Sequence, residues 1–381
     1  MKWKTTTLGN IASNIQTGPF GSQLHQSDYS EIGTPVVMPK DLINGQITES
    51  SIARVDDSHV VRLSKHQIEN GDIIYSRRGD VGRCAYATKK EQGWLCGTGC
   101  LRVTIDNTKA VSKYVFYQLQ KQETIGWVEN HAVGSTMLNL NTSILSSVPI
   151  CVPELLVQER IVNILSAYDD LIENNQKQIK LLEEAAQRLY KEWFVDLRFP
   201  GHEHTAIVDG VPEGWIKCVV TDLLDIKYGK DHKFLNDGNI PVYGSGGIMR
   251  KVEPILYSGE SVLIPRKGSL NNILYVSGDF WTIDTMFYSV PKRLNIAKYV
   301  YLFLSQLDMY SFNTGAAVPS MTVKILESID TILPSETVIN AFNDVVSPLF
   351  NRIQLLQEQS EKSKQARDRL LPKLMSGELE V

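Results

Sequence analysis

The most regular pattern in this sequence is a heptad repeat of apolar positions between residues 161 and 193. The steps alternate between four and three residues, at Ile161, Leu165, Tyr168, Ile172, Asn175, Ile179, Leu182, Ala186, Leu189 and Trp193. This spacing places one apolar stripe along a helix that packs against a partner helix. It predicts a long helix over residues 154–199. The polar Asn175 either sets the pairing register or marks a water-exposed break, and we favour register.

A shift of 181 residues finds a second copy of this stripe. It continues through Phe342, Val346, Leu349, Ile353 and Leu356, lapses at Ser360, Ser363 and Arg367, and returns at Leu370 and Leu374. A second long helix is therefore predicted over residues 335–381. Pro153 and Pro334 stand just before the two helices, where a missing amide costs little. Pro372 is expected to kink or end the second helix.

The two predicted helices need each other. Each has about 40 residues and is thus about 60 Å long, and a lone helix with such a stripe would be unstable in water. The stripes are therefore predicted to bury each other as an antiparallel coiled-coil rod. A short connection leads from the first helix into the second globular part, so the rod would carry one globular part at each end.

The repeat also covers the globular parts, residues 1–153 and 200–334. Gly134 corresponds to Gly315, and the segments SKYVFYQL, GDIIYSRRG and TPVV resemble AKYVYLFL, GESVLIPRKG and IPVY. Short apolar runs broken by turn residues predict strands, with helices at 114–120 and 299–306. The predicted fold class is α+β: two similar mixed domains joined by two long antiparallel helices, with a pseudo-two-fold internal repeat.

The seam between the copies is FPGHEHTAIVDGVPEGW, residues 199–215. His202 and His204 are two potential metal ligands, but a zinc site usually has three or four protein ligands. The Pro and Gly residues suit a turn that leaves a helix, so the segment is interpreted as a linker, and no metal site is predicted. Trp215 matches Trp3 and marks the beginning of the second copy.

Composition narrows the classes of protein. A chain of 381 residues suits two or three domains. The net charge of −4 argues against a polycation that coats nucleic acid, but it allows a local basic cleft. The five cysteines form no C-x-x-C pair and are interpreted as reduced thiols. With no apolar signal segment and no run long enough to cross a membrane, a cytoplasmic protein is expected.

Motifs for catalysis are missing from the sequence. It contains no N/D-P-P-Y/F methyltransferase motif and no G-x-x-x-x-G-K-S/T phosphate loop. Gly244, Gly246 and Gly247 begin like a dinucleotide fingerprint, but Met249 occupies the place of its last glycine. A glycine-rich turn is the interpretation adopted, and the chain is not expected to be an enzyme.

Two similar heads on one rod suit duplex DNA, whose grooves recur about every 34 Å. A non-catalytic coiled-coil scaffold with two protein-binding heads could use the same geometry. It would differ in having no salt-dependent affinity for DNA in any assembly.

Particular sequence motifs favour the DNA-binding protein over the scaffold. VPELLVQERIVNIL (152–165), LIENNQKQIKLLEEAAQRLYKEWFVDLRFPG (171–201), VPEGW (211–215) and LLPKLMSGEL (370–379) resemble the conserved regions of the specificity subunit of type I restriction-modification systems. YSRRGDVG (75–82) and IPRKGSLNNILYV (264–276) resemble its R-x-G loops. The resemblance covers the whole chain and the order of its parts. Two departures stand out: the second long helix lacks a counterpart of Gln158, and Ala316-Ala317 replaces Ser135-Thr136.

The resemblance implies a division of labour. Each globular part would be a target recognition domain that reads one half of a bipartite, asymmetric site on double-stranded DNA. The rod would set the gap between the halves and dock two modification subunits, which would bring S-adenosylmethionine and methylate adenine N6. Restriction subunits would add ATP- and Mg-dependent translocation and cleavage. No cofactor is expected in this chain itself.

The candidate DNA-binding residues are cations, which suit phosphates, and small polar side chains, which suit phosphates or base edges. In the first domain they are Lys40, Arg77, Arg78, Arg83, Ser135, Thr136, Asn139 and Asn141. In the second domain they are Lys230, Lys233, Arg250, Arg266, Lys267, Asn271 and Asn272. The alternative for each is an ordinary solvated side chain. Arg77-Arg78 and Arg266-Lys267 are the strongest candidates, because both pairs stand beside a glycine that lets a loop approach a phosphate closely.

Overall fold

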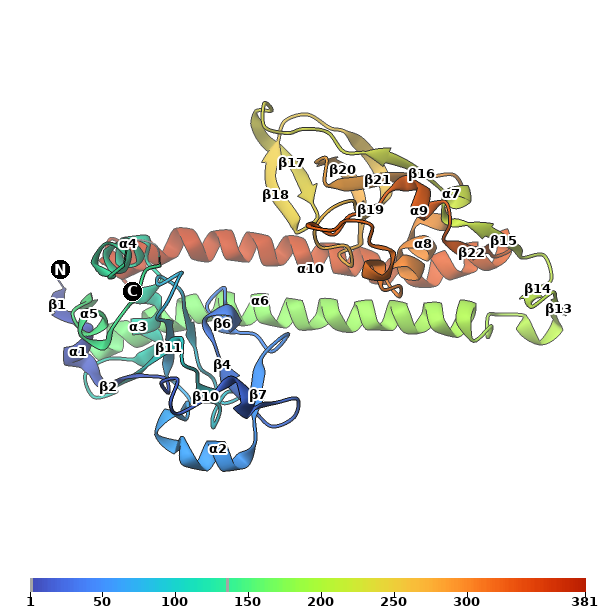
Figure 1. Cartoon of the computed structure of the whole chain (residues 1–381). Helices are drawn as coiled ribbons and strands as arrows, with labels where there is room; N and C mark the ends of the chain where they lie inside the picture. Colours follow the sequence, from blue (N-terminus) through green and yellow to red (C-terminus); the bar gives the residue numbers. More distant parts are fainter. Residues whose placement is uncertain (1–2, 135–136) are drawn as a thin grey trace. The chain divides into compact units, whose positions relative to one another are not determined.

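The computed structural model describes residues 3–134 and 137–381, and their contacts divide the chain into two compact units. Unit 1 consists of residues 1–174 and 360–381, and unit 2 of residues 175–359. Each unit therefore combines a globular part with one section of each long helix (Figure 1).

Unit 1 is built on two four-stranded sheets. The first is antiparallel, in the order β2 (Ala12–Thr17), β11 (Cys100–Ile105), β8 (Ile73–Ser76) and β9 (Cys84–Tyr86). The second is mixed, in the order β10 (Leu95–Cys96), β4 (Thr34–Val37), β7 (Ala53–Val55) and β3 (Tyr29–Ser30). The pairs β1 (Lys4–Thr7) with β12 (Pro149–Val152) and β5 (Leu42–Ile43) with β6 (Gln46–Ile47) complete its strands. Its helices include α1 (Leu8–Ile11), α2 (Asp57–Arg62), α3 (Ser112–Leu119), α4 (Gln122–His131) and α5 (Thr142–Ser146).

Unit 2 is built on one six-stranded sheet. Its order is β16 (Leu224–Tyr228), β21 (Met286–Pro291), β19 (Tyr257–Pro265), β20 (Leu274–Thr282), β17 (Asp237–Gly244) and β18 (Gly247–Val252). Strand β15 (Ile216–Val219) pairs with β22 (Asp330–Leu333) beside it. Its shorter helices are α7 (Val220–Leu223), α8 (Ile296–Leu304) and α9 (Val323–Leu326).

The internal repeat is real in three dimensions. The antiparallel order β2-β11-β8-β9 of unit 1 recurs as β16-β21-β19-β20 in unit 2. The pair β1–β12 recurs as β15–β22, and the parallel pair β4–β10 recurs as β17–β20. The predicted helices at 114–120 and 299–306 are found as α3 and α8. This agreement confirms the predicted α+β fold with two similar domains.

The heptad positions behave as predicted. Helix α6 (Leu155–Tyr190) continues into a π-helical segment (Lys191–Val195), and α10 runs over Glu336–Ser376. All the heptad positions of α6 are buried or half-buried. Of the two outcomes expected at Pro372, a kink or an end of the helix, the end is wrong, because α10 continues past Pro372 to Ser376. A proline removes one amide donor, and packing of the last turn through Leu374 and Met375, both fully buried, compensates for it.

Within each unit the two long helices pair in antiparallel fashion. In unit 1, Arg367 of α10 donates to the Asp169 carboxylate of α6, at 2.7 Å, and the Tyr117 hydroxyl of α3 donates to the same carboxylate. In unit 2, the fully buried Asn175 amide donates to Gln359 Oε1 at 3.2 Å. This cross-helix bond agrees with the interpretation of Asn175 as a register residue rather than a water-exposed break.

Aromatic packing closes the seam after α6. Phe194 packs against Trp215, Tyr299 and Phe342, with ring centroids 4.7–5.8 Å apart. Phe199 packs on Trp215 as well, with centroids 5.0 Å apart. The segment 199–215 itself holds a short 3₁₀ turn (His202–His204) and the hairpin β13 (Ile207–Val208) and β14 (Val211–Pro212). It is thus a packed connection between the end of the π-helical segment and β15.

A partly buried ion pair in unit 2 makes stability depend on pH. Lys298 of α8 donates to Glu260 of β19, and the Tyr275 hydroxyl donates to the same carboxylate. Burial alone would raise the pKa of Glu260, but these two hydrogen bonds together with the positive charge of Lys298 outweigh it, and the pKa is lowered from 4.5. The stabilisation is therefore fully present above pH 4.5 and is lost as the pH falls through the lower, folded-state pKa.

The expected result is an acid-sensitive difference between wild type and the variant Glu260→Gln. At pH 7 the wild type should be more stable by about 1 kcal/mol, a value reduced for the partial exposure of the carboxylate. Urea unfolding measured between pH 7 and pH 3 should show this difference shrink below pH 4.5. An unchanged difference across that range would contradict the assignment of a charged Glu260.

Candidate nucleic-acid interface

The two R-x-G loops hold equivalent positions in the two units. Arg77 follows β8, and Arg266 follows β19. The Arg77 amide donates to Gly99 O, and the Arg77 carbonyl accepts from the Leu140 amide, both at 2.8 Å. The Arg266 amide likewise donates to Thr285 O at 2.8 Å, and its carbonyl accepts from the Met321 amide at 2.9 Å. Each loop is thus tied between a strand end and the segment that precedes α5 or α9.

This tie brings together residues that the sequence keeps apart. Arg78 forms a β-bridge with Asn139, and Lys267 forms the equivalent bridge with Ser320. The predicted cationic loop and the predicted polar loop of the first domain are therefore neighbours. Ser135 and Thr136, two further candidates of that polar loop, lie outside the described residues. Asn141 lies at its end, where its side chain caps α5 by accepting from the Ile144 amide at 2.8 Å.

Glycine shapes both loops. Gly79 and Gly268 have φ of 76° and 89°, a left-handed conformation that favours glycine. Their amides donate to Leu138 O and Pro319 O, at 3.1 and 2.9 Å. The backbone can therefore turn sharply just after each cationic pair, which leaves Arg78 and Lys267 exposed.

The cationic candidates fall into two groups: those that form an ion pair with a carboxylate and those that do not. Asp80 pairs with Arg83 at 2.7 Å, and Asp237 pairs with Arg250 at 2.5 Å. Arg250 also donates to the Leu235 carbonyl, so its side chain holds the neighbouring loop in place. In the part of the chain that the structure describes, no carboxylate pairs with the cationic candidates Lys40, Arg77, Arg78, Lys230, Lys233, Arg266 or Lys267. These unmatched cations are better placed for phosphates.

The two asparagines of the second domain have structural partners. Asn271 accepts from the Met309 amide at 2.7 Å and donates to Asp308, and Asn272 donates to Ser245 O at 2.8 Å. Asn272 thereby fixes the β17–β18 turn, which contains the Gly244–Gly247 stretch. Lys40 donates to Ser51 O at 2.6 Å, but its side chain remains exposed. The asparagine side chains therefore shape the loops that carry the cations.

The structure explains why the second long helix lacks a counterpart of Gln158. Gln158 is fully buried, where its side chain accepts from the Val111 amide and donates to Pro153 O, both at 2.8 Å. It fastens the start of α6 to the start of α3. At the equivalent place in unit 2, Asn295 before α8 donates to Asn340 of α10 at 2.8 Å. The missing glutamine in the second copy therefore reflects a different fastening of the helix.

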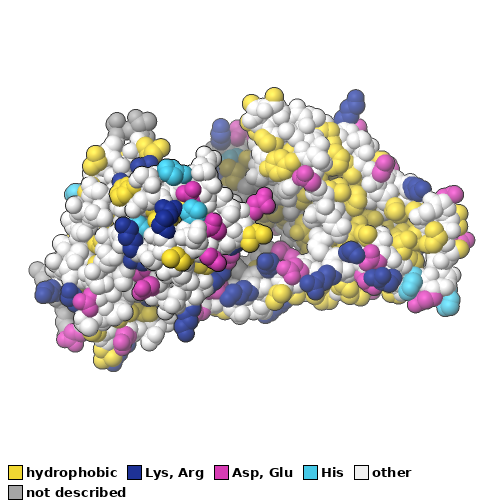
Figure 2. Space-filling model, turned by 60° about the horizontal axis from the view of Figure 1, so that its bottom comes forward, with side chains coloured by type: hydrophobic (Ala, Val, Ile, Leu, Met, Phe, Trp, Pro, Cys, Tyr) yellow, Lys and Arg dark blue, Asp and Glu magenta, His cyan; other side chains and the backbone are white. Residues whose placement is uncertain are grey.

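Sequence reasoning missed two exposed aromatic residues beside the R-x-G loops. Arg77 lies over the ring of Phe20, and Arg266 lies over the ring of Tyr228. Tyr228 ends β16 and precedes Gly229, whereas Phe20 lies beyond the end of β2, between Gly18 and Gly21. These nearby glycines are the one signal that could have found the rings. Elsewhere the surface is mixed: Figure 2 shows Lys and Arg side chains interspersed with Asp and Glu on the face in view.

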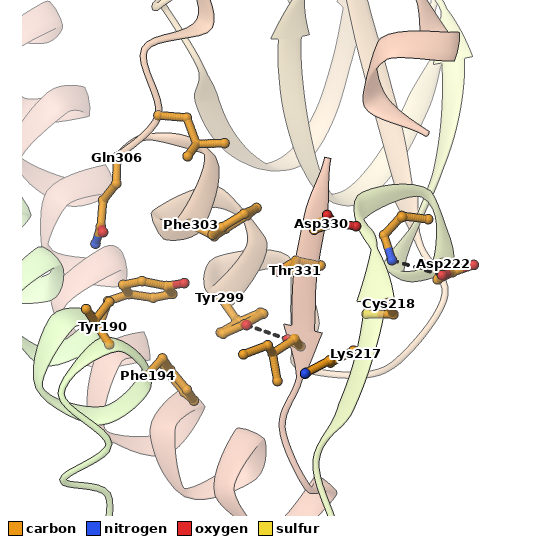
Figure 3. A pocket seen from close by; sticks show the side chains of 14 residues that line it. Tyr190, Phe194, Lys217, Cys218, Asp222, Tyr299, Phe303, Gln306, Asp330 and Thr331 are labelled. Carbon is orange, nitrogen blue, oxygen red and sulfur yellow. Dashed lines mark hydrogen bonds between the residues drawn. The ribbon is translucent and has the colours of Figure 1, made fainter. Parts of the chain in front are cut away.

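A pocket in unit 2 lies apart from these loops. Its volume is about 770 Å³, and its lining includes Tyr190 and Phe194 from the end of α6, Tyr299 and Phe303 from α8, and Cys218 from β15 (Figure 3). Burial, followed by the Asp222 charge, raises the pKa of the Cys218 thiol, which disfavours the reactive thiolate. No histidine is among the lining residues, so the pocket offers Cys218 no imidazole base.

Within residues 3–134 and 137–381, no three His, Cys, Asp or Glu side chains gather as a metal ion requires. The His202 ring bonds to the Phe199 carbonyl. No helix in the described part of the chain has the length and apolar character needed to cross a membrane.

Comparison with known proteins finds the same two copies of the repeat. The family model for the type I restriction modification DNA specificity domain matches residues 1–184 and 212–363, which are the two copies of the repeat. The chain belongs to this family. Membership confirms the predicted role of a DNA specificity subunit in a type I restriction-modification system. The family is defined by DNA specificity rather than by a catalytic activity.

Relatives of this family align along nearly the whole chain. The MjaIX specificity subunit of Methanocaldococcus jannaschii is 27% identical, with 91% of this chain and 87% of the relative covered. The HindI specificity subunit of Haemophilus influenzae is 21% identical, with 99% of both chains covered. The crystal structure of a type I S subunit from M. genitalium has a TM-score of 0.60 at 20% identity and covers 98% of this chain and 96% of its own. That likeness confirms the fold.

Proposed function

We propose that this specificity subunit reads a bipartite, asymmetric DNA sequence, with one half-site for each globular domain. The observation that supports the proposal is that both domains share one strand framework but differ in the segments around it. The strand order β2-β11-β8-β9 and its copy β16-β21-β19-β20 present equivalent cationic loops. The loops around them differ, as with α4 in unit 1 and the long hairpin β17–β18 in unit 2. Two such surfaces suit two different base sequences.

The proposed partners supply the chemistry. Two modification subunits would dock on the paired helices α6 and α10, bind S-adenosylmethionine and methylate adenine N6 in each half-site. Restriction subunits would add ATP- and Mg-dependent translocation and cleavage. This chain would contribute recognition and spacing without a catalytic residue of its own, in the cytoplasm where host DNA lies. The long helices α6 and α10 suit a ruler, because a helix has a fixed rise of about 1.5 Å per residue.

The test is co-expression with the neighbouring modification subunit, followed by sequencing of the host methylome. The expected result is a split motif with N6-methyladenine on both strands, which reveals both half-sites at once. A stable complex that leaves no methylation and has no salt-dependent DNA affinity would contradict the proposal. The non-catalytic scaffold with two protein-binding heads would then be the better description.

A further inference from the structure

An exposed aromatic ring supports the R-x-G arginine in each domain. Phe20 is 53% exposed and Tyr228 is 54% exposed, although large aromatic side chains are usually buried. The Arg77 guanidinium carbon lies 5.6 Å from the centroid of the Phe20 ring, and that of Arg266 lies 5.3 Å from the Tyr228 centroid. Both distances are within the range of a cation–π contact.

The two rings reach these equivalent places from different backbone positions. Gly18 and Gly229 correspond, because their amides donate to Cys100 O and Met286 O at the same point of the sheet. Phe20 comes two residues after its glycine, whereas Tyr228 comes one residue before its own. Aligning the two copies by sequence would not pair the rings. Two independent solutions for one arrangement indicate that the arrangement itself has a role.

The charge of each arginine remains available to a ligand. Among the described residues, no carboxylate pairs with Arg77 or Arg266. Arg77 Nε is buried without a hydrogen-bond partner, and Arg266 donates one bond to the Asp284 carbonyl at 3.2 Å. A guanidinium has five N–H donors and remains protonated in proteins. Each pair therefore places a charged, planar donor group against a ring and leaves it with unused donors.

We propose that Arg77 with Phe20, and Arg266 with Tyr228, form one sequence-independent phosphate-binding device in each domain. This inference rests on the proposed function and assigns a part of its DNA contacts. Two half-sites of different base sequence have the same sugar–phosphate chemistry. An arrangement found in both domains is therefore expected to contact the backbone rather than the bases. Geometry agrees, because base edges lie at the floor of a groove about 8.5 Å deep. An arginine in contact with a ring of its own domain reaches the phosphates at the groove edge more readily.

The test measures how salt weakens DNA binding by the complex of the full chain with its modification subunit. Each phosphate contact contributes about 0.9 to the slope of log affinity against log salt concentration. Arg77→Ala and Arg266→Ala are each expected to reduce that slope by about 0.9. The methylated sequence should stay the same in both variants. Arg77→Lys and Arg266→Lys keep the charge and should retain the slope, with weaker binding.

The rings are tested by replacements that keep an apolar side chain. Phe20→Leu and Tyr228→Leu remove the π face, and binding should weaken about two- to fivefold, the equivalent of a cation–π contact of about 0.5–1 kcal/mol. The slope should not change. Matched controls are Lys109→Ala and Lys227→Ala, in which the lost charge is already paired with Asp106 and Asp225. These controls should leave both slope and affinity unchanged.

Two outcomes would overturn the device. One is a slope in the arginine-to-alanine variants equal to that of the lysine controls. The other is a methylome in which one base of one half-site is relaxed, because that result makes the arginine a base reader. Failure of the proposed function looks different, because the wild-type complex itself would then show no salt-dependent binding and no methylation.

Discussion

Replacing Phe342 by alanine is expected to lower the free energy of unfolding of unit 2 by about 3–5 kcal/mol. Phe342 is 1% exposed and lies where α10 meets the end of α6. Its ring makes an edge-on contact with Phe194, with centroids 4.8 Å apart, and a tilted contact with Trp193, at 5.5 Å. Neighbours that are themselves large rings cannot collapse into the space that a missing ring leaves, so the cavity adds to the lost burial.

Guanidinium unfolding, followed by tryptophan fluorescence, measures this loss. Leu355→Ala on the same helix is the matched control, because Leu355 is 57% exposed and its truncation should cost no more than about 0.5 kcal/mol. If Phe342→Ala cost no more than this control, the two long helices would not share a core in unit 2.

Replacing Gly229 by alanine is expected to disable the second recognition surface. A Cβ atom at this position would lie 2.0 Å from Ile283 O and 2.7 Å from Thr282 O. Both are backbone atoms at the end of β20 and just after it, so the end of β16 must move. Overpacking of this kind costs about 1–3 kcal/mol or more. The displaced segment carries Tyr228 and Lys230, and DNA binding should weaken about tenfold, equivalent to about 1.4 kcal/mol.

The control for this prediction is Gly246→Ala. Gly246 lies in the β17–β18 turn of the same unit, and a Cβ atom there meets no other atom within 4 Å. Both variants lose one glycine from the unfolded chain, so their difference isolates the steric effect. DNA binding by Gly229→Ala that equals that of Gly246→Ala would show that the end of β16 does not position the recognition surface.

The sequence predicted the long helices well because their pattern is local and long. The ten heptad positions between residues 161 and 193 repeat over more than four heptads, and only a helix paired with another stripe satisfies such spacing. The repeat of 181 residues then predicted that the second half of the chain has the same framework, including α3 and α8. The possible end of the helix at Pro372 was the exception, since the buried side chains of Leu374 and Met375 hold the last turn in place beyond the proline.

The candidate interface was predicted less completely. Placing Arg77-Arg78 and Arg266-Lys267 beside glycines gave two loops that the structure confirms as equivalent. The same reasoning also named Arg83 and Arg250 as weaker candidates, and the structure pairs them with Asp80 and Asp237. It also named Asn141 and Asn271, and the structure shows that Asn141 caps α5 and that Asn271 accepts from the Met309 amide, while their contact with DNA stays a prediction.

The sequence by itself thus determined the two-copy framework, the paired helices and the family, because periodicity and repetition are properties of neighbouring positions along a chain. Only the tertiary structure decided which cations are matched by carboxylates and which rings support Arg77 and Arg266. Phe20 and Arg77 are 57 positions apart, and Tyr228 and Arg266 are 38 apart. Such contacts depend on how strands cross in the sheet, where a glycine such as Gly18 or Gly229 allows two backbones to touch. No local pattern records that crossing.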